Sequence, residues 1–264
     1  MFATYAYKAG ATAAQVAADL AALVCGANLA ALSAGCNKDA SSIGGEAPGW
    51  AAFDGTYNVC KGVDASGVDK FMRLLVSGSD VQATVCESWN SATHVAVNAV
   101  TAQKIITVSA SGGVVYVVAN QENVVFWPGD SSSWLYVSEI GRDSPLLPAG
   151  YPVICLGYST YPANIYLPRF KNTAAAGDVT NSNLLMRYAM GNVNMQPRAP
   201  GEVLYWQLMP LVAAAPSNQV FYGYMRGMFI APASQTGGRL VDTGGAEHVQ
   251  LYVDASTCYA VERK

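Results

Sequence analysis

The two histidines are the first residues to consider for catalysis, because a Ser-His-Asp set needs an imidazole that exchanges a proton near neutral pH. The chain contains only His94 and His248. No GxSxG nucleophile motif occurs, and residues 111–113 (Ser-Gly-Gly) have the position of a hairpin turn. An enzyme would need a pocket that holds one of the histidines beside a carboxylate. The sequence shows no such partner, so we expect no catalytic residue at either position.

Carboxylates that could act as a pair in glycoside hydrolysis are present, but the sequence does not pair them across a cleft. Each is explained equally well as a solvated residue of a turn or strand edge. No phosphate-binding loop, dinucleotide fingerprint or calcium-loop motif occurs. We therefore expect a protein that is not an enzyme and has no cofactor. The carboxylates considered are Glu87, Asp130, Glu139, Asp143, Asp178 and Glu202.

The six cysteines contain no CxxC spacing, and only two histidines could assist them, so we expect no zinc site. Several cysteines lie in apolar, strand-like runs, which favours buried free thiols. The even number leaves disulfide bonds open as the alternative. The cysteines are Cys25, Cys36, Cys60, Cys86, Cys155 and Cys258.

Tyrosines are the remaining candidates for a binding surface. Tyrosines with Asn and Asp neighbours can stack on sugars, and Asn164 lies among three of them. Packing at a protein interface suits the same side chains better, because one end of a tyrosine is apolar and the other is polar. The expected interface residues are Tyr158, Tyr161, Tyr166, Tyr222 and Tyr224.

The composition favours assembly. Hydrophobic residues make up 52% of the chain and charged residues 12%, about half of the roughly 25% usual in soluble domains. A surface with so few charges does not maximise the solubility of a monomer, so we expect partners to cover part of it. An apolar monomer with a polar Ser/Thr/Asn surface is the alternative. The net charge of −3, without any basic run, argues against nucleic acid as a partner.

The elements that position these residues begin with a helix. Residues 12–36 are Ala-rich like a secretion signal, but Asp19 interrupts the apolar run and Lys8 is the only basic residue before it. Thr12 can cap a helix that ends at Gly26, and we prefer this interpretation. No stretch is apolar over the roughly 20 residues that a membrane span needs. The helix face is Val16, Leu20, Leu23 and Val24.

Strand pairs come after the helix. Residues 50–54 and 56–61 predict two strands joined at Asp54-Gly55, a dipeptide of the type that supplies the positive φ of a tight hairpin. Residues 70–76 and 81–89 predict a second pair, with apolar and polar residues alternating from Val81 to Val85. Residues 1–98 therefore resemble a small α+β module in which a helix packs on an antiparallel sheet.

Residues 99–264 are nearly free of helical patterns. Short strands separated by turns, at residues 104–110, 114–119, 124–127 and 133–139, predict a β-sandwich-like unit. Seven prolines interrupt residues 144–200, so we expect a long, irregular Pro-rich loop or partner-embracing arm there. Strands resume after residue 203. The fold class expected is thus a β-rich α+β fold of two modules, 1–98 and 99–264.

The sequence also resembles virion structural proteins of tailed bacteriophages. The likeness involves Tyr5-Ala6-Tyr7-Lys8-Ala9-Gly10 before the Ala-rich helix, the block from Trp50 to His94, and residues 222–232 near the C-terminus. It implies a subunit of the tail, baseplate or neck, located in the tail region of the virion. Its partners would be copies of itself and neighbouring virion proteins. A receptor- or glycan-binding module at the virion periphery, with host-surface glycan as partner, is the alternative.

Overall fold

The computed structural model describes residues 1–63, 69–97, 99, 102–121 and 123–128, together with the strands β12 to β21 between residues 134 and 263. These residues form one α-helix, two short 3-10 helices and a set of antiparallel sheets. The expected β-rich fold with an N-terminal helix on an antiparallel sheet is confirmed. Within the described residues, no helix has the length and apolar character needed to cross a membrane.

The central sheet has seven strands in the order β14-β13-β12-β11-β10-β1-β2, and every neighbouring pair is antiparallel. From β10 to β14 the strands succeed one another as a meander, whereas β1 comes from the start of the chain. The strands are β1 (Phe2–Tyr7), β2 (Ser42–Gly44), β10 (Gly113–Ala119), β11 (Asn123–Pro128), β12 (Trp134–Glu139), β13 (Pro152–Tyr158) and β14 (Tyr161–Tyr166).

The outer sheet has five strands in the order β3-β4-β5-β6-β9, and a two-stranded hairpin, β7–β8, comes directly after β6. The outer strands are β3 (Ala51–Asp54), β4 (Val59–Val63), β5 (Asp69–Ser77), β6 (Asp80–Cys86) and β9 (Gln103–Thr107). The hairpin strands are β7 (Ser88–Asn90) and β8 (Val95–Val97).

The C-terminal sheet has the order β15-β18-β21-β20-β19, and β16–β17 form a separate pair. Its strands are β15 (Trp206–Gln207), β18 (Met228–Ala231), β19 (Arg239–Asp242), β20 (Glu247–Tyr252) and β21 (Cys258–Arg263). The separate pair is β16 (Leu211–Ala215) and β17 (Asn218–Phe221).

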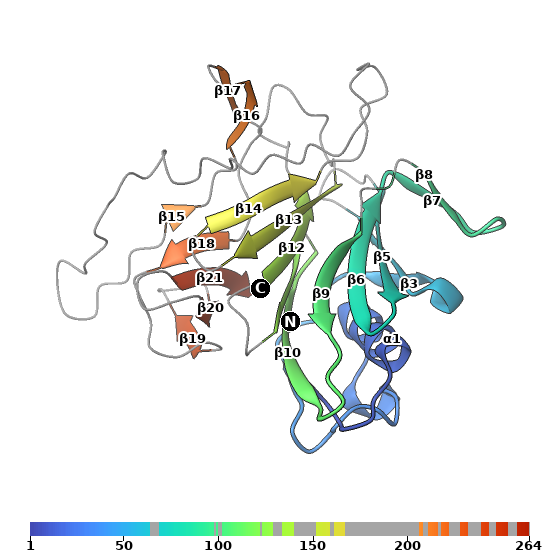
Figure 1. Cartoon of the computed structure of the whole chain (residues 1–264). Helices are drawn as coiled ribbons and strands as arrows, with labels where there is room; N and C mark the ends of the chain where they lie inside the picture. Colours follow the sequence, from blue (N-terminus) through green and yellow to red (C-terminus); the bar gives the residue numbers. More distant parts are fainter. Residues whose placement is uncertain are drawn as a thin grey trace.

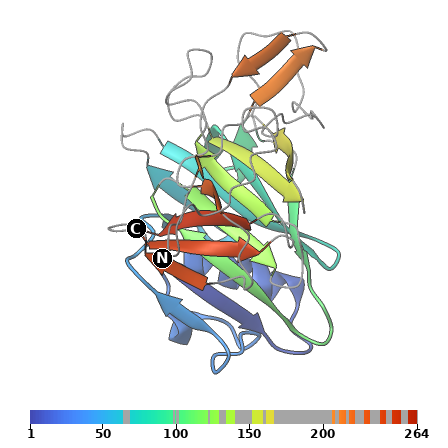
Figure 2. The ribbon, with the colours of Figure 1, turned by 90° about the vertical axis from the view of Figure 1, so that its left-hand side faces the viewer.

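The three sheets are arranged as layers, with the central sheet between the C-terminal sheet and the outer sheet (Figure 1). Figure 2 shows the C-terminal sheet in front of the central sheet, which agrees with this order. All six residues of β11 are buried, as expected for a strand covered on both faces. This double cover explains why residues 124–127 are apolar without alternation.

Helix α1 (Ala13–Val24) confirms the helix predicted after Thr12. The Thr12 hydroxyl accepts a hydrogen bond from the Gln15 N–H at 3.2 Å, and Gln15 Oε1 accepts one from the Thr12 N–H at 2.9 Å, which is a capping box. Gly26 is located just after the helix at φ 82°, and a 3-10 turn, η1 (Leu29–Ala31), comes next. The apolar face of α1 shares one hydrophobic core with the central and outer sheets.

The prediction of a hairpin turn at residues 111–113 is wrong. Strand β9 pairs with β6 in the outer sheet, whereas β10 pairs with β1 and β11 in the central sheet. The segment therefore crosses from one sheet to the other. Gly112, at φ 88°, allows this crossing to pass close to Tyr7. Strands from both sides of residue 98 thus share the central sheet and also the outer sheet.

The first predicted strand pair is confirmed as β3–β4, but its turn differs from the expectation. A 3-10 turn, η2 (Gly55–Tyr57), occupies the connection, and Asn58 rather than Gly55 has the left-handed conformation, at φ 53°. Residues 56 and 57 are therefore not part of a strand. The second pair is confirmed as β5–β6, with Gly78 at φ 61° in its turn.

The segment predicted as an irregular Pro-rich loop contains two strands, β13 and β14. Pro152 is the first residue of β13, and Pro162 lies opposite Gly157 where the register shifts. Both are positions at which a strand tolerates a residue without a backbone N–H. The irregular interpretation is wrong for these two stretches, and the rest of residues 144–200 lies outside the described residues.

Candidate functional site

The hairpin β7–β8 covers part of the outer sheet on the side opposite α1. Trp89 of β7 is 6% exposed and packs with Val59, Phe71 and Cys86, while Ala96 of β8 packs against the same cluster. We call these residues the hairpin cluster. Thr84 lies on the same face of β6. The alternation along this strand suggests that Thr84 faces solvent, but it is buried because the hairpin covers this face.

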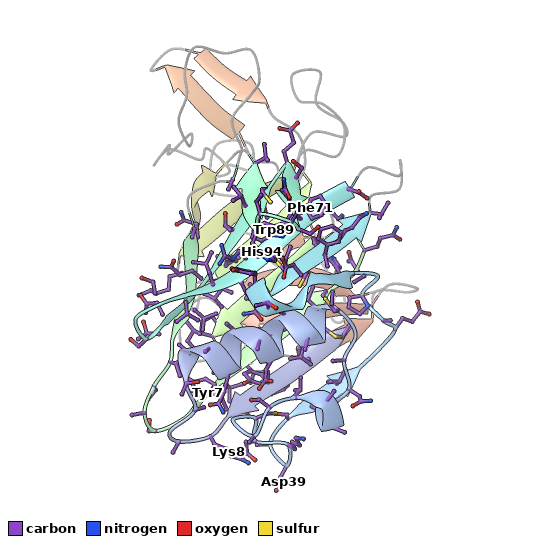
Figure 3. The ribbon with its side chains drawn as sticks, turned by 90° about the vertical axis from the view of Figure 1, so that its right-hand side faces the viewer. Tyr7, Lys8, Asp39, Phe71, Trp89 and His94 are labelled. Carbon is purple, nitrogen blue, oxygen red and sulfur yellow. The ribbon has the colours of Figure 1, made fainter. Side chains whose placement is uncertain are left out.

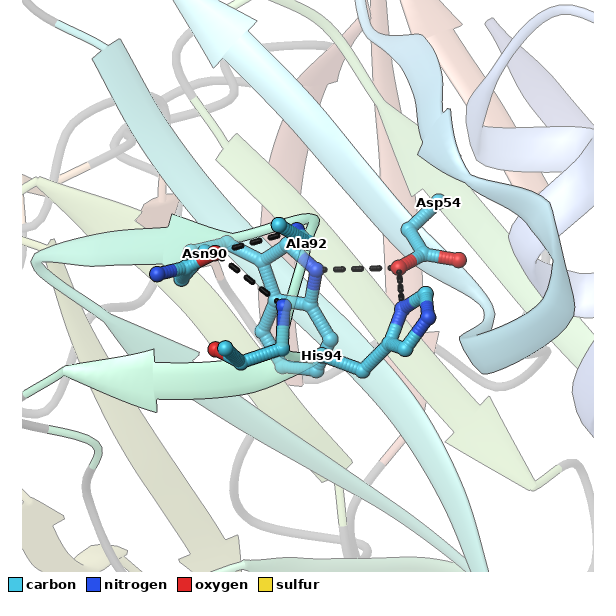
Figure 4. Close-up of polar contacts among 6 residues, drawn as sticks. Asp54, Asn90, Ala92 and His94 are labelled. Atoms are coloured by element: carbon cyan, nitrogen blue, oxygen red, sulfur yellow. Dashed lines mark hydrogen bonds and ion pairs between the residues drawn. The ribbon is translucent and has the colours of Figure 1, made fainter.

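A carboxylate holds the hairpin to the edge of the sheet. Asp54, the last residue of β3, accepts a hydrogen bond at Oδ2 from Trp89 Nε1 at 3.1 Å (Figure 4). The same oxygen lies 2.6 Å from His94 Nδ1. The Asp54 side chain is only 7% exposed, whereas that of His94 is 41% exposed. The contact therefore joins a buried carboxylate to a solvent-facing imidazole.

The turn of the hairpin is shaped locally so that His94 reaches Asp54. Asn90 Oδ1 accepts hydrogen bonds from the N–H groups of Ala92 at 3.0 Å and Thr93 at 3.2 Å. Such Asx turns mimic a backbone turn and are a common role of asparagine. His94 comes next at φ 55°, a left-handed conformation that non-glycine residues adopt infrequently.

Aromatic and cationic groups surround this contact. The Tyr57 ring stacks on the His94 ring at a centroid distance of 4.4 Å. The guanidinium of Arg73 lies 5.4 Å from the ring centroids of both Tyr57 and Trp89, within the range of cation–π attraction. Figure 3 shows Phe71, Trp89 and His94 close together on one side of the molecule.

The hydrogen bond from His94 is the main cause that lowers the pKa of Asp54 below its ordinary value, and the Trp89 N–H acts in the same direction against the effect of burial. Burial raises the pKa of Cys86 to about 12, although the nearby Arg73 charge opposes this. Near neutral pH, Asp54 is therefore ionised and Cys86 is a protonated, unreactive thiol.

A carboxylate that accepts from Nδ1 orients an imidazole and leaves Nε2 available for a proton, as in catalytic His-Asp pairs. Catalysis would also need a nucleophile beside the imidazole. Among the described residues, no serine, threonine or cysteine hydrogen-bonds to His94, and no three His, Cys, Asp or Glu side chains are grouped to hold a metal ion. The contacts that are present attach the hairpin to β3.

Exposed apolar side chains border the hairpin. Phe53 of β3 is 41% exposed, and Val95 and Val97 of β8 are 55% and 43% exposed. Phe53 contacts Phe71 of the hairpin cluster edge-on, with ring centroids 5.2 Å apart, and Lys61 Nζ lies 5.7 Å from the Phe53 centroid. The Asp54–His94 contact joins β3 to the start of β8. We call Phe53, Val95 and Val97 the apolar rim.

Of the candidate histidines, carboxylates and tyrosines whose surroundings the structure describes, only His94 lies in the polar site around Asp54. His94 lies beside a carboxylate, but the partner is Asp54, which was not among the carboxylates considered. No local pattern could have indicated a contact over 40 positions. His248 lies within β20, opposite Val241 and Glu262. Glu87 donates its backbone N–H to Val97 at 3.2 Å, and Glu139 ends β12.

Among the expected interface tyrosines, Tyr158 and Tyr161 are opposite each other at the end of the β13–β14 pair, and Tyr166 is opposite Ile154. The positions outside the described residues are Tyr222, Tyr224, Asp130, Asp143, Asp178 and Glu202. A comparison of the chain with protein-family models and with curated protein sequences found no match.

Proposed function

We propose that this chain is a structural subunit of a tailed-phage virion, in the tail, baseplate or neck, and that it acts by protein–protein assembly. The observation that carries the assembly role is the apolar rim, because its three large apolar side chains, Phe53, Val95 and Val97, are exposed. The virion assignment is supported by the resemblance of the sequence to virion structural proteins. Neighbouring copies and other virion proteins would be its partners.

The rim lies on strands that have free edges in the described sheets. Among the strands that the structure describes, β3 is the end strand of the outer sheet and β8 pairs only with β7. The edge of a sheet offers unpaired N–H and C=O groups, and proteins usually blunt such edges with charges or cover them. Here β3 presents Ala51, Ala52 and Phe53 to solvent instead. Partner proteins that cover both edges would account for the apolar side chains there.

The proposal extends beyond the described residues. It includes a β-sandwich-like unit within residues 99–264. It also includes binding of partners by the part of the Pro-rich segment 144–200 outside β13 and β14. The tyrosines at positions 158, 161, 166, 222 and 224 are the proposed contact residues there. The low content of charged residues, 12%, supports a surface that is covered in the assembly.

The test is the oligomeric state of the purified chain, measured by size-exclusion chromatography with light scattering. The wild type should associate as its concentration rises, and Val95→Lys/Val97→Lys should shift the midpoint of association at least tenfold higher. Val76→Lys is the matched control, because Val76 is 41% exposed but lies at the far end of β5. A wild type that stays monomeric, or a double variant that associates normally, contradicts the assembly role.

Imaging of intact phage particles tests the virion assignment separately. Density that fits the central and outer sheets should occur in several copies around the tail axis. Particles without this chain contradict the assignment and leave the association measurement unaffected.

Binding of host-surface glycan is the second candidate. The observation that favours it is the half-exposed ring of Phe53 beside the charged Lys61. Lys61 in turn forms an ion pair of 2.8 Å with Asp69. The position of Lys61 over the Phe53 ring occupies a face on which a sugar would stack, so assembly is the better supported role. Retention on a polysaccharide column that Phe53→Ala abolishes would reverse this order.

A further inference from the structure

Two cysteines far apart in sequence meet where α1 ends against the outer sheet. Cys25 is the C-cap residue of α1, and its backbone N–H donates to the Ala21 carbonyl at 3.1 Å. Cys60 of β4 donates its thiol to the same carbonyl, with a separation of 3.6 Å. Because both groups donate to one oxygen, the Cys60 sulfur lies beside the backbone of Cys25. Both cysteines are free thiols in the structure.

The surroundings give the two thiols different roles. Cys60 is 1% exposed within the core, whereas Cys25 is only partly buried at its edge. The hydrogen bond from Cys60 lowers the pKa of Cys25, and the same contact, together with burial, raises the pKa of Cys60. An accessible thiol with the lower pKa attacks an oxidant first, and a protected neighbour resolves the product.

We propose that Cys25 and Cys60 are a redox modification site, which forms a disulfide bond between α1 and β4 when the protein meets a small-molecule disulfide. This inference does not depend on the virion assignment. The backbone around Cys25 is already held in place, because Gly26 at φ 82° donates to the Leu23 carbonyl and Ala27 donates to that of Ala22.

The exchange is balanced with oxidised glutathione as the oxidant. The Cys25 thiolate attacks one sulfur of glutathione disulfide, which forms a mixed disulfide and expels one glutathione thiolate. The sulfur of Cys60 then attacks Cys25 Sγ and displaces the second glutathione, which leaves with the proton of the Cys60 thiol. The protein loses two electrons and two protons, and the oxidant is reduced to two thiols.

The other cysteines with described surroundings lack such a partner. Cys86 lies on the opposite face of the outer sheet, in the hairpin cluster, where burial raises its pKa to about 12. Cys36 is buried, and its sulfur lies 3.5 Å from Ser41 Oγ. Within the described part of the chain, no third His, Cys, Asp or Glu joins Cys25 and Cys60, so the pair does not form a metal site there.

The experiment treats the native full-length chain with excess oxidised glutathione and maps the products by mass spectrometry after alkylation of free thiols. The wild type should lose two hydrogen atoms and two titratable thiols, with a peptide linked through Cys25 and Cys60. Its thermal unfolding midpoint should rise, because the bond restricts the unfolded chain. Reduction with dithiothreitol should reverse both changes.

Three variants test the role of each cysteine separately. Cys60→Ser should keep glutathione attached to Cys25, because nothing displaces it, whereas Cys25→Ser should not form the linked peptide. Cys36→Ser is the matched control and should behave as wild type; it also removes the second cysteine between Lys8 and Lys38, which would share a tryptic peptide with Cys25. Absence of thiol loss, a lasting glutathione adduct on the wild type, or a bond mapped to other cysteines overturns the proposal.

Discussion

At the scale of single residues, two buried carboxylates connect distant parts of the chain. Asp19, in the Ala-rich helix, is 3% exposed and accepts hydrogen bonds from the Tyr5 hydroxyl at 2.8 Å and from the Ser33 N–H at 2.7 Å and hydroxyl at 2.8 Å. It therefore ties α1 to β1 and to the loop after η1. Burial, together with the smaller effect of the hydrogen bond to Asp19, raises the pKa of Tyr5.

Replacing Asp19 should be costly because it leaves three donors without their acceptor. We expect Asp19→Ala to lower the free energy of unfolding by about 3 kcal/mol, and Tyr5→Phe, which removes one donor, by about 1 kcal/mol. Urea unfolding followed by circular dichroism measures both. Equal effects of the two variants would contradict this role of the carboxylate.

Asp54 makes attachment of the hairpin sensitive to acid. Because its pKa is lower in the folded protein than in the unfolded chain, its ionised form stabilises the fold above the unfolded value, about 3.9. This contribution is lost as the pH falls through the still lower folded-state pKa. We therefore expect amide exchange in residues 88–97 to accelerate below about pH 4, beyond the intrinsic pH dependence of exchange.

Asp54→Asn is the control for this pH dependence, because the amide retains an acceptor oxygen but does not titrate. Its hairpin should exchange faster than wild type at neutral pH and should lack the additional change in acid. Hydrogen exchange with mass spectrometry measures the segment directly. An identical acid response in the variant would assign the effect to other groups.

At the scale of elements, the crossing between β9 and β10 depends on a glycine. A Cβ atom added to Gly112 would lie 2.7 Å from the Tyr7 carbonyl oxygen, and the φ of 88° is unfavourable for other residues. Gly112→Ala should lower the free energy of unfolding by about 3 kcal/mol. Gly78, at φ 61°, has no atom within 4 Å of an added Cβ, so Gly78→Ala should cost only about 1 kcal/mol. Thermal unfolding of both variants tests the difference, and equal losses would show that the contact with Tyr7 is unimportant.

At the scale of the whole molecule, the N-terminal residues depend on strands from later in the chain to complete the two larger sheets. Without residues beyond 98, β1 loses β10 and β6 loses β9. A fragment of residues 1–98 should therefore lack a cooperative thermal transition, whereas a fragment of residues 1–128, which keeps both partners, should show one. Well-dispersed amide resonances from fragment 1–98 would contradict this dependence and support a module that folds alone.

Local signals are enough to predict the elements whose causes lie in neighbouring residues. Thr12, the spacing of Val16, Leu20 and Leu23, and Gly26 predict α1, because capping and helical periodicity act within a few residues. Alternation and a glycine turn predict the strands β5 and β6 in the same way. The turn after β3 is less predictable, since Asn58 has the left-handed conformation that the sequence suggests for Gly55.

By itself, the sequence determined the helix, most of the strands and the shortage of charge. Only the tertiary structure decided that β9 and β10 belong to different sheets, that His94 contacts Asp54, and that Cys25 and Cys60 donate to the same carbonyl. The reason is that strand pairing and side-chain contacts between distant residues depend on which surfaces are buried together in the folded chain. Local preference cannot specify such pairs, because each residue's own neighbours contain no information about its partner.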